Sequence, residues 1–125
     1  MKTSEANINI TRVDDVLSSI SIIMPTWKHQ EDKSLSVIIP LFGIKTFAKD
    51  FDDADVATNE AIKCFCIASE KFGQGIEKEL QTIGWAAVDN NNSLLNYSIE
   101  SNDNIVLEQI METGDQFAEN NLAIA

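Results

Sequence analysis

Residues 50–83 carry the strongest periodic pattern in the sequence and constrain the fold most. Their apolar residues recur in steps of three or four, the spacing that places side chains on one face of a helix. The stripe consists of Ala57, Ala61, Phe65, Ala68, Phe72, Ile76, Leu80 and Ile83. Gly73 and Gly75 interrupt it, and each glycine costs roughly 1 kcal/mol against alanine inside a helix. We therefore predict two helices, about 53–72 and 75–83, rather than one kinked helix.

An acidic run precedes the first predicted helix: Asp50, Asp52, Asp53 and Asp55. Asp52 or Asp53 could accept hydrogen bonds from the first free N–H groups, at the end of the helix dipole that favours negative charge. A calcium loop of the EF-hand type needs glycine at its sixth position and glutamate at its twelfth. Counted from Asp50, those positions hold Asp55 and Ala61. We interpret the run as a helix cap, with a hard-metal site formed by two of these carboxylates as the alternative.

The residues before residue 50 have the patterns of β-strands, with apolar and polar residues alternating or β-branched residues clustering. The predicted strands are 8–13, 16–27, 34–40 and 44–48, with a polar hairpin loop over 28–33 and a turn at Gly43. Pro25 is expected at the end of its strand or on a sheet edge, because proline cannot donate a hydrogen bond to a ladder.

Residues 86–125 form a second strand-rich part. The turn-forming cluster 89–93 precedes a strand in which Leu95, Tyr97 and Ile99 alternate with polar residues, and 105–111 read as a further strand. We expect Phe117, Leu122 and Ile124 to act as scattered apolar anchors. The order of strands, helices and strands predicts an α+β fold, with a mainly antiparallel sheet and the helices on one face. A chain of 125 residues fits a single domain, 1–125.

The charge is strongly acidic and unevenly distributed. The chain has a net charge of −11, and residues 79–125 contain no lysine or arginine and carry −8. Nucleic-acid affinity rests largely on basic side chains that neutralise phosphates, so the sequence excludes nucleic-acid binding through residues 79–125. A basic protein partner fits this charge, as does a well-solvated surface without a partner.

Nothing in the sequence predicts a membrane or secreted protein. No apolar run approaches the roughly 18 residues of a bilayer-spanning helix, and the first residues are polar, without a secretory segment. The only two cysteines lie two positions apart, which rules out a disulfide framework. We expect a soluble, cytoplasmic protein.

The residues that could carry enzyme chemistry are few. His29 is the only histidine and lies among charged residues, while Cys64 and Cys66 project to different faces of the predicted helix. The close pair Gly73 and Gly75 lacks the strand and the third glycine of a dinucleotide-binding motif. We therefore predict no catalytic, cofactor-binding or metal-binding residue.

Two tryptophans offer candidate contacts with a partner. Trp27 and Trp85 each stand near the end of an apolar segment, and tryptophan is enriched among the residues that dominate interface energies. Packing in or beside the core is the alternative for both. Together with Asp50, Asp52 and Asp53, they are the candidate interface residues.

From residue 34 to residue 85 the chain resembles the HicB-type antitoxin family. The matching elements are Val37-Ile38-Ile39-Pro40, then Gly43, then Asp53-Ala54-Asp55 leading to Asn59-Glu60-Ala61-Ile62. The resemblance implies a truncated ribonuclease-H-like core over about 8–85 that binds and blocks a small basic toxin. Many family members add a DNA-binding helical domain. Residues 86–125 depart from that pattern because they read as acidic strands.

The sequence therefore favours a non-catalytic interaction module of antitoxin-like build that binds a basic protein. One alternative is a metal-dependent enzyme that uses the acidic cluster at 50–55. Another is a homo-oligomer that pairs exposed strand edges or the face near Trp85.

Overall fold

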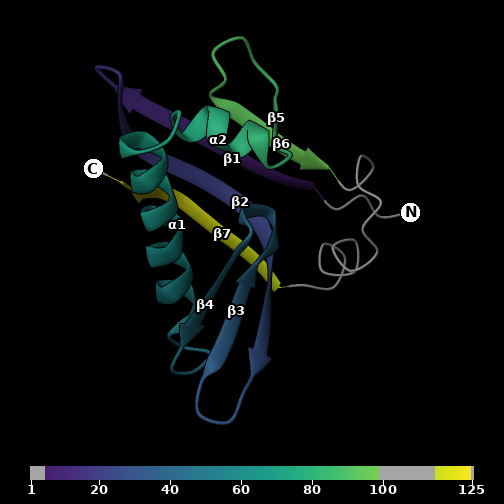
Figure 1. The fold of residues 1–125 in the computed structure, drawn as a ribbon. Helices are drawn as coiled ribbons and strands as arrows, with labels where there is room; N and C mark the ends of the chain where they lie inside the picture. Colours follow the sequence, from purple (N-terminus) through teal and green to yellow (C-terminus); the bar gives the residue numbers. More distant parts are fainter. Residues whose placement is uncertain (1–4, 99–114, 125) are drawn as a thin grey trace.

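The computed structural model describes residues 5–98 and 115–124, and its elements confirm an α+β fold with a mostly antiparallel sheet (Figure 1). The strands are β1 (Glu5–Val13), β2 (Val16–Gln30), β3 (Leu35–Ile39), β4 (Ile44–Ala48), β5 (Ala86–Ala87), β6 (Leu94–Ser98) and β7 (Asp115–Ala123). The helices are the single 3-10 turn η1 (Pro40–Phe42), followed by Gly43 with φ 67°, and the α-helices α1 (Ala54–Lys71) and α2 (Ile76–Thr82). The predicted pair of helices is confirmed.

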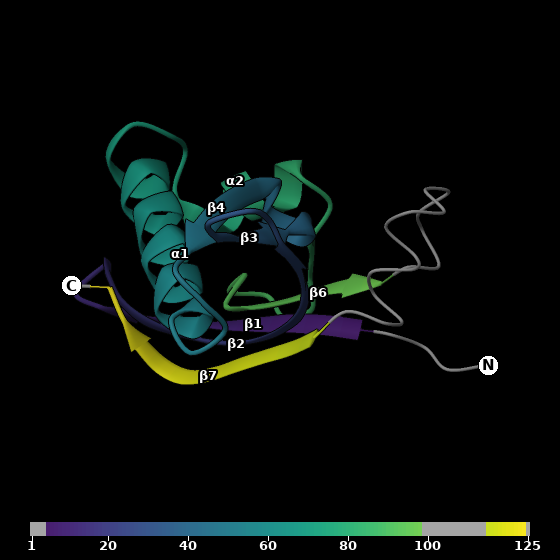
Figure 2. The ribbon, with the colours of Figure 1, turned by 90° about the horizontal axis from the view of Figure 1, so that it is seen from below.

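Strand β2 organises the sheet. The strand order is β4-β3-β2-β1-β6-β5, and β7 also pairs with β2. Along its 15 residues β2 pairs with β1 over 16–23, with β7 over 19–26 and with β3 over 27–30, always antiparallel. Figure 2 shows β2 curving out of the layer that it forms with β1 and β7 and up toward β3 and β4. The two halves of the sheet are thus joined through one continuous strand.

The predicted end of β2 was wrong. Residues 28–30, predicted as hairpin loop, extend the strand, because their backbones pair with β3 while exposed positions such as His29 keep polar side chains in solvent. Pro25 lies inside the strand and not at its end. Pro25 is paired with Gln116 of β7, whereas the register of β2 with β1 stops at Ile23. Within the described residues, β2 therefore has a partner on only one side at Pro25, so this position is locally an edge, where proline is tolerated.

The buried face of helix α1 overlaps the predicted stripe only in part: Ala57 is buried, and Ala61 and Phe65 are half-buried against the core. Its buried residues are Ala54, Ala57, Thr58, Ile62, Cys66 and Ser69. The predicted residue Ala68 is exposed, and Phe72 is 87% exposed at the end of the helix. Polar residues can lie on the buried face because their hydroxyl groups are satisfied within the helix. Thr58 donates to the carbonyl of Ala54 and Ser69 to that of Phe65, each at 2.8 Å.

The core is one cluster of buried residues drawn from the strands, η1 and both α-helices. The predicted strand after the 89–93 turn is confirmed as β6, whereas residues 105–111 lie outside the described part of the chain. Residues 115–123 form a strand, β7, with a register irregularity near Asn121 (φ 60°), and not scattered anchors, although Phe117 and Leu122 are buried as expected.

Candidate functional site

The two tryptophans occupy opposite environments. Trp85 is only 2% exposed, and its indole N–H donates a 3.0 Å hydrogen bond to the carbonyl of Leu41. Its ring stands nearly perpendicular to those of Phe42 and Tyr97, with centroids 6.0 and 5.7 Å away. Trp27 is 38% exposed on β2. Trp85 is therefore a core residue with no surface to offer a partner, whereas Trp27 remains accessible.

The acidic run organises the turn between β4 and α1. The Asp50 carboxylate accepts a 2.9 Å hydrogen bond from the N–H of Asp53, whose own carboxylate accepts one from the N–H of Lys49 at 3.3 Å. Asp53 stands at the N-cap of α1, but no side chain there bonds to the helix N–H groups. The expected carboxylate cap is thus wrong, because these side chains turn back toward the loop. Asp52 is exposed in the same turn.

In the described ranges 5–98 and 115–124, no group of three or more His, Cys, Asp or Glu side chains that could hold a metal ion gathers. Cys64 is exposed and Cys66 is buried, as expected for positions on different helix faces. Burial, with a smaller effect from the charge of Glu70, raises the pKa of the Cys66 thiol to about 12. Cys66 therefore behaves as a small apolar core residue.

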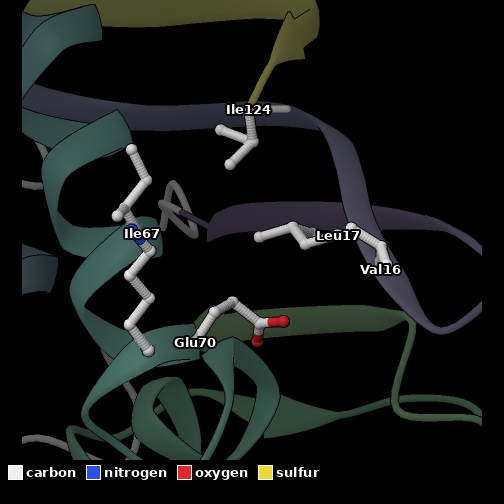
Figure 3. A pocket seen from close by; sticks show the side chains of 6 residues that line it. Val16, Leu17, Ile67, Glu70 and Ile124 are labelled. Atoms are coloured by element: carbon white, nitrogen blue, oxygen red, sulfur yellow. The ribbon is translucent and has the colours of Figure 1, made fainter.

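The most distinctive surface feature is an apolar pocket between α1 and the start of β2 (Figure 3). Its volume is about 180 Å³, and its lining residues are Val16, Leu17, Ile67, Glu70, Lys71 and Ile124. Figure 3 shows Leu17 pointing from β2 toward α1, with Ile124 projecting into the space above. Val16 and Ile67 are more than 40% exposed, so the mouth of the pocket is aliphatic and open to solvent.

The β1–β2 turn borders this pocket and forms the hairpin tip, Val13–Val16. Val13 and Val16 are each more than half exposed. Between them, Asp14 and Asp15 have positive φ angles of 52° and 64°, as a two-residue type I′ hairpin requires. The tip thus presents two adjacent carboxylates flanked by two exposed valines.

A side-chain network, here called the arginine clamp (Arg12, Glu70 and Glu77), ties β1 to both helices. The Arg12 guanidinium makes two hydrogen bonds of 2.8 Å to Glu70 and two of 2.7 Å to Glu77. A fifth, of 3.0 Å, reaches the carbonyl of Asp15 in the hairpin tip. Glu70 also accepts the N–H of Ile76 at 2.9 Å, at the start of α2. The clamp therefore fixes the hairpin tip relative to the wall of the pocket.

The network also sets the charge state of its members. Hydrogen bonds from Arg12 hold the pKa values of the Glu70 and Glu77 carboxyls below their ordinary range, and the two glutamates in turn raise the pKa of Arg12. Both glutamates are therefore ionised near neutral pH. Sequence reasoning missed this clamp. The only signal was that Arg12 is the single arginine of the chain.

Replacing the turn residues Asp14 and Asp15 with asparagine and glycine should stabilise the protein by about 0.5–1 kcal/mol. Asn-Gly is the preferred pair for a type I′ turn, and glycine has no steric cost at positive φ. Urea unfolding of the double variant against wild type measures the change. Glu31→Gln/Asp32→Asn, at the loop between β2 and β3, removes the same two charges and is the control for charge removal alone. An unchanged or lower midpoint in the Asn-Gly variant would show that the two aspartates carry no backbone cost.

None of the helices in the described part of the chain is long and apolar enough to span a membrane. Comparisons of the chain with protein-family models, with curated proteins and with solved structures found no match.

Proposed function

We propose that this protein is a non-catalytic interaction module of antitoxin-like build that binds a basic protein partner in the cytoplasm. The observation that carries the proposal is the apolar pocket beside the hairpin tip. An aliphatic pocket mouth, the exposed valines Val13 and Val16 and the exposed carboxylates of Asp14 and Asp15 meet on one surface of a chain with a net charge of −11. Apolar contact supplies affinity there, and the carboxylates select a positively charged partner.

The pocket has the size for one anchoring side chain. A cavity of about 150 Å³ can hold a benzene molecule, and this pocket measures about 180 Å³. A branched aliphatic or aromatic side chain of the partner would contact Leu17, Ile67 and Ile124. A lysine or arginine next to it in the partner would reach Asp14 or Asp15.

The arginine clamp supports this role because it holds the site in place before binding. Five hydrogen bonds from Arg12 join the tip, α1 and α2. A surface that is already ordered loses less conformational entropy when a partner binds. The resemblance of residues 34–85 to HicB-type antitoxins agrees with the same proposal, since that family binds small basic toxins.

Co-purification from native lysate tests the proposal with two charge-matched variants. Asp14→Lys/Asp15→Lys and Asp32→Lys/Glu60→Lys change the net charge equally, but only the first alters the hairpin tip. We expect wild type and the second variant to retain a stoichiometric basic protein. The first variant, and Ile67→Asp in the pocket, should bind it at least about tenfold more weakly, a loss of about 1.4 kcal/mol.

Salt provides a second readout. Because the partner is selected by charge, its binding to wild type should weaken as ionic strength rises through the range in which the Debye length falls from about 10 Å to about 3 Å. Recovery of no stoichiometric partner would refute the proposed function. Equal loss of the partner in both lysine variants would show that overall charge, and not the hairpin tip, governs binding.

A further inference from the structure

Positive charge is concentrated in one part of this acidic molecule. Residues 27–49 contain four lysines and two acidic residues, a net charge of +2, so the remaining residues carry −13. These residues form the end of β2 together with β3, η1 and β4. Figure 1 shows this half of the sheet at the opposite end of the molecule from the hairpin tip. It is therefore a separate surface from the one used in the proposed function.

Strand β4, which helix α1 contacts, is an edge strand of the sheet. It is the last strand in the order, and within residues 5–98 and 115–124 it pairs only with β3. An edge strand leaves a row of backbone N–H and C=O groups that another extended chain can pair with. The side chain of Phe47 on this edge strand is 55% exposed.

The outer face next to this edge is aromatic and basic. Cross-strand register places Lys45, Ile38 and Trp27 in one row. Phe47, Ser36 and His29 form the next row on the same face, because residues two apart in a strand share a face. The Lys45 ammonium lies 5.4 Å from the centroid of the Phe47 ring. The opposite face holds the buried residues Leu35, Val37 and Ala48.

We propose that the open edge of β4 binds an extended acidic peptide, which adds a strand to the sheet. Main-chain hydrogen bonds to β4 supply affinity, and alternate side chains supply specificity, as in other strand-addition complexes. A glutamate or aspartate in the peptide meets Lys45, and an aromatic or β-branched residue two positions away packs on Phe47.

Charge favours an acidic peptide over nucleic acid at this edge. Lys45 lies 3.9 Å from Glu31, and Lys28 lies 3.5 Å from Asp115, so two of the four lysines already have carboxylate neighbours. The −13 charge of the other residues repels a long polyphosphate more than a short peptide. A polynucleotide also lacks the regular run of peptide N–H and C=O groups that would continue the ladder.

Titration of the labelled protein by NMR with a short alternating peptide, Ac-TETYTET-NH2, tests the proposal. We expect chemical-shift changes confined to β4 and its neighbours, and slower hydrogen exchange of the β4 amides. Lys45→Glu and Phe47→Ala should each weaken binding at least about tenfold, equal to about 1.4 kcal/mol. The matched controls Lys78→Glu and Phe72→Ala alter a lysine and a phenylalanine exposed elsewhere, and should change affinity by less than about twofold.

Four results would overturn the proposal. If the basic peptide Ac-TKTYTKT-NH2 binds with the same affinity as the acidic peptide, charge does not select the ligand. If a backbone N-methylated acidic peptide binds with the same affinity, main-chain hydrogen bonds to β4 do not hold it. Protected β4 amides in a wild-type dimer without peptide would show that a second copy holds this edge. Displacement of the peptide by a single-stranded oligonucleotide would favour nucleic acid instead. Asp14→Lys/Asp15→Lys should leave peptide binding unchanged, which keeps this test independent of the proposed function.

Discussion

Replacing Trp85 with alanine is expected to lower the free energy of unfolding by about 3–5 kcal/mol. The side chain is 2% exposed and packs edge-on against Phe42 and Tyr97. Its removal loses apolar contact, leaves a cavity and removes the hydrogen bond to the carbonyl of Leu41. The free energy of unfolding of a domain is usually about 5–15 kcal/mol, so this loss is a large part of the total stability. Chemical denaturation followed by circular dichroism measures the loss.

Trp27→Ala is the matched control for this change, because it removes the same side chain from an exposed position. It should cost no more than about 1 kcal/mol. Trp85→Phe should cost an intermediate amount, about 1–3 kcal/mol, since the Leu41 carbonyl loses its buried donor. Similar losses for Trp85→Ala and Trp27→Ala would contradict the assignment of Trp85 to the core.

Arg12→Met is the second change with a large expected effect, a loss of about 2–3 kcal/mol at neutral pH. Removing one partner of a charge network leaves the other charges partly desolvated and unpaired, which costs about 3–5 kcal/mol when they are fully buried. The Arg12 and Glu70 side chains retain about a quarter of their exposure (both 26%) and Glu77 19%, so we discount that figure for solvent screening. Denaturant midpoints of wild type and variant give the difference.

The same network predicts how stability depends on pH. The pKa values of Glu70 and Glu77 are lowered from their ordinary value of 4.5 in the folded protein, chiefly by hydrogen bonds from Arg12. Their contribution is therefore complete above pH 4.5 and is lost as the pH falls through the lowered folded-state values. The stability difference between wild type and Arg12→Met should be constant near pH 7 and shrink below pH 4.5. A difference that grows in acid would show that the clamp does not hold these carboxylates ionised.

Glu31→Gln serves as the control for an exposed ion pair. Glu31 and Lys45 lie 3.9 Å apart with about half of each side chain exposed, and such pairs contribute about 0–1 kcal/mol. The triple variant Arg12→Met/Glu70→Gln/Glu77→Gln should recover part of the stability lost by Arg12→Met, because no unpaired carboxylate remains. If the triple variant is no more stable than Arg12→Met, the stability lost in Arg12→Met comes from the lost packing of the arginine side chain.

Much of the fold could be predicted from local patterns in the sequence. Strand β4 has the predicted bounds, 44–48, and α1 and α2 lie within one residue of theirs. These elements were predictable because the spacing of apolar residues and the positions of glycines depend on the local backbone conformation of a segment. Gly75, with φ 94°, separates the two helices as expected.

Features set by tertiary contact could not be predicted. The buried face of α1 contains Thr58 and Ser69, which a hydrophobicity pattern assigns to solvent. Residues 28–30 are polar but pair with β3. In the arginine clamp, Arg12 is separated from Glu70 by 58 positions and from Glu77 by 65 positions in the sequence. Only the fold brings these residues together. Likewise the pocket combines the start of β2, the end of α1 and Ile124, so no local motif predicts it.

The pairing of β2 with β7 has a consequence for synthesis of the chain. Thr26 and Asp115, which lie opposite each other in this pair, are 89 positions apart. The ribosome adds about 5–20 residues per second. Residues 19–26 of β2 therefore lack their partner strand β7 for roughly 5–20 s after they have been synthesised. During that time a long apolar strand presents open backbone groups to other nascent chains, a known route to aggregation. Until β7 has been synthesised, this flank of β2 therefore remains exposed to misassembly, even after β1 and β3 have paired with the strand.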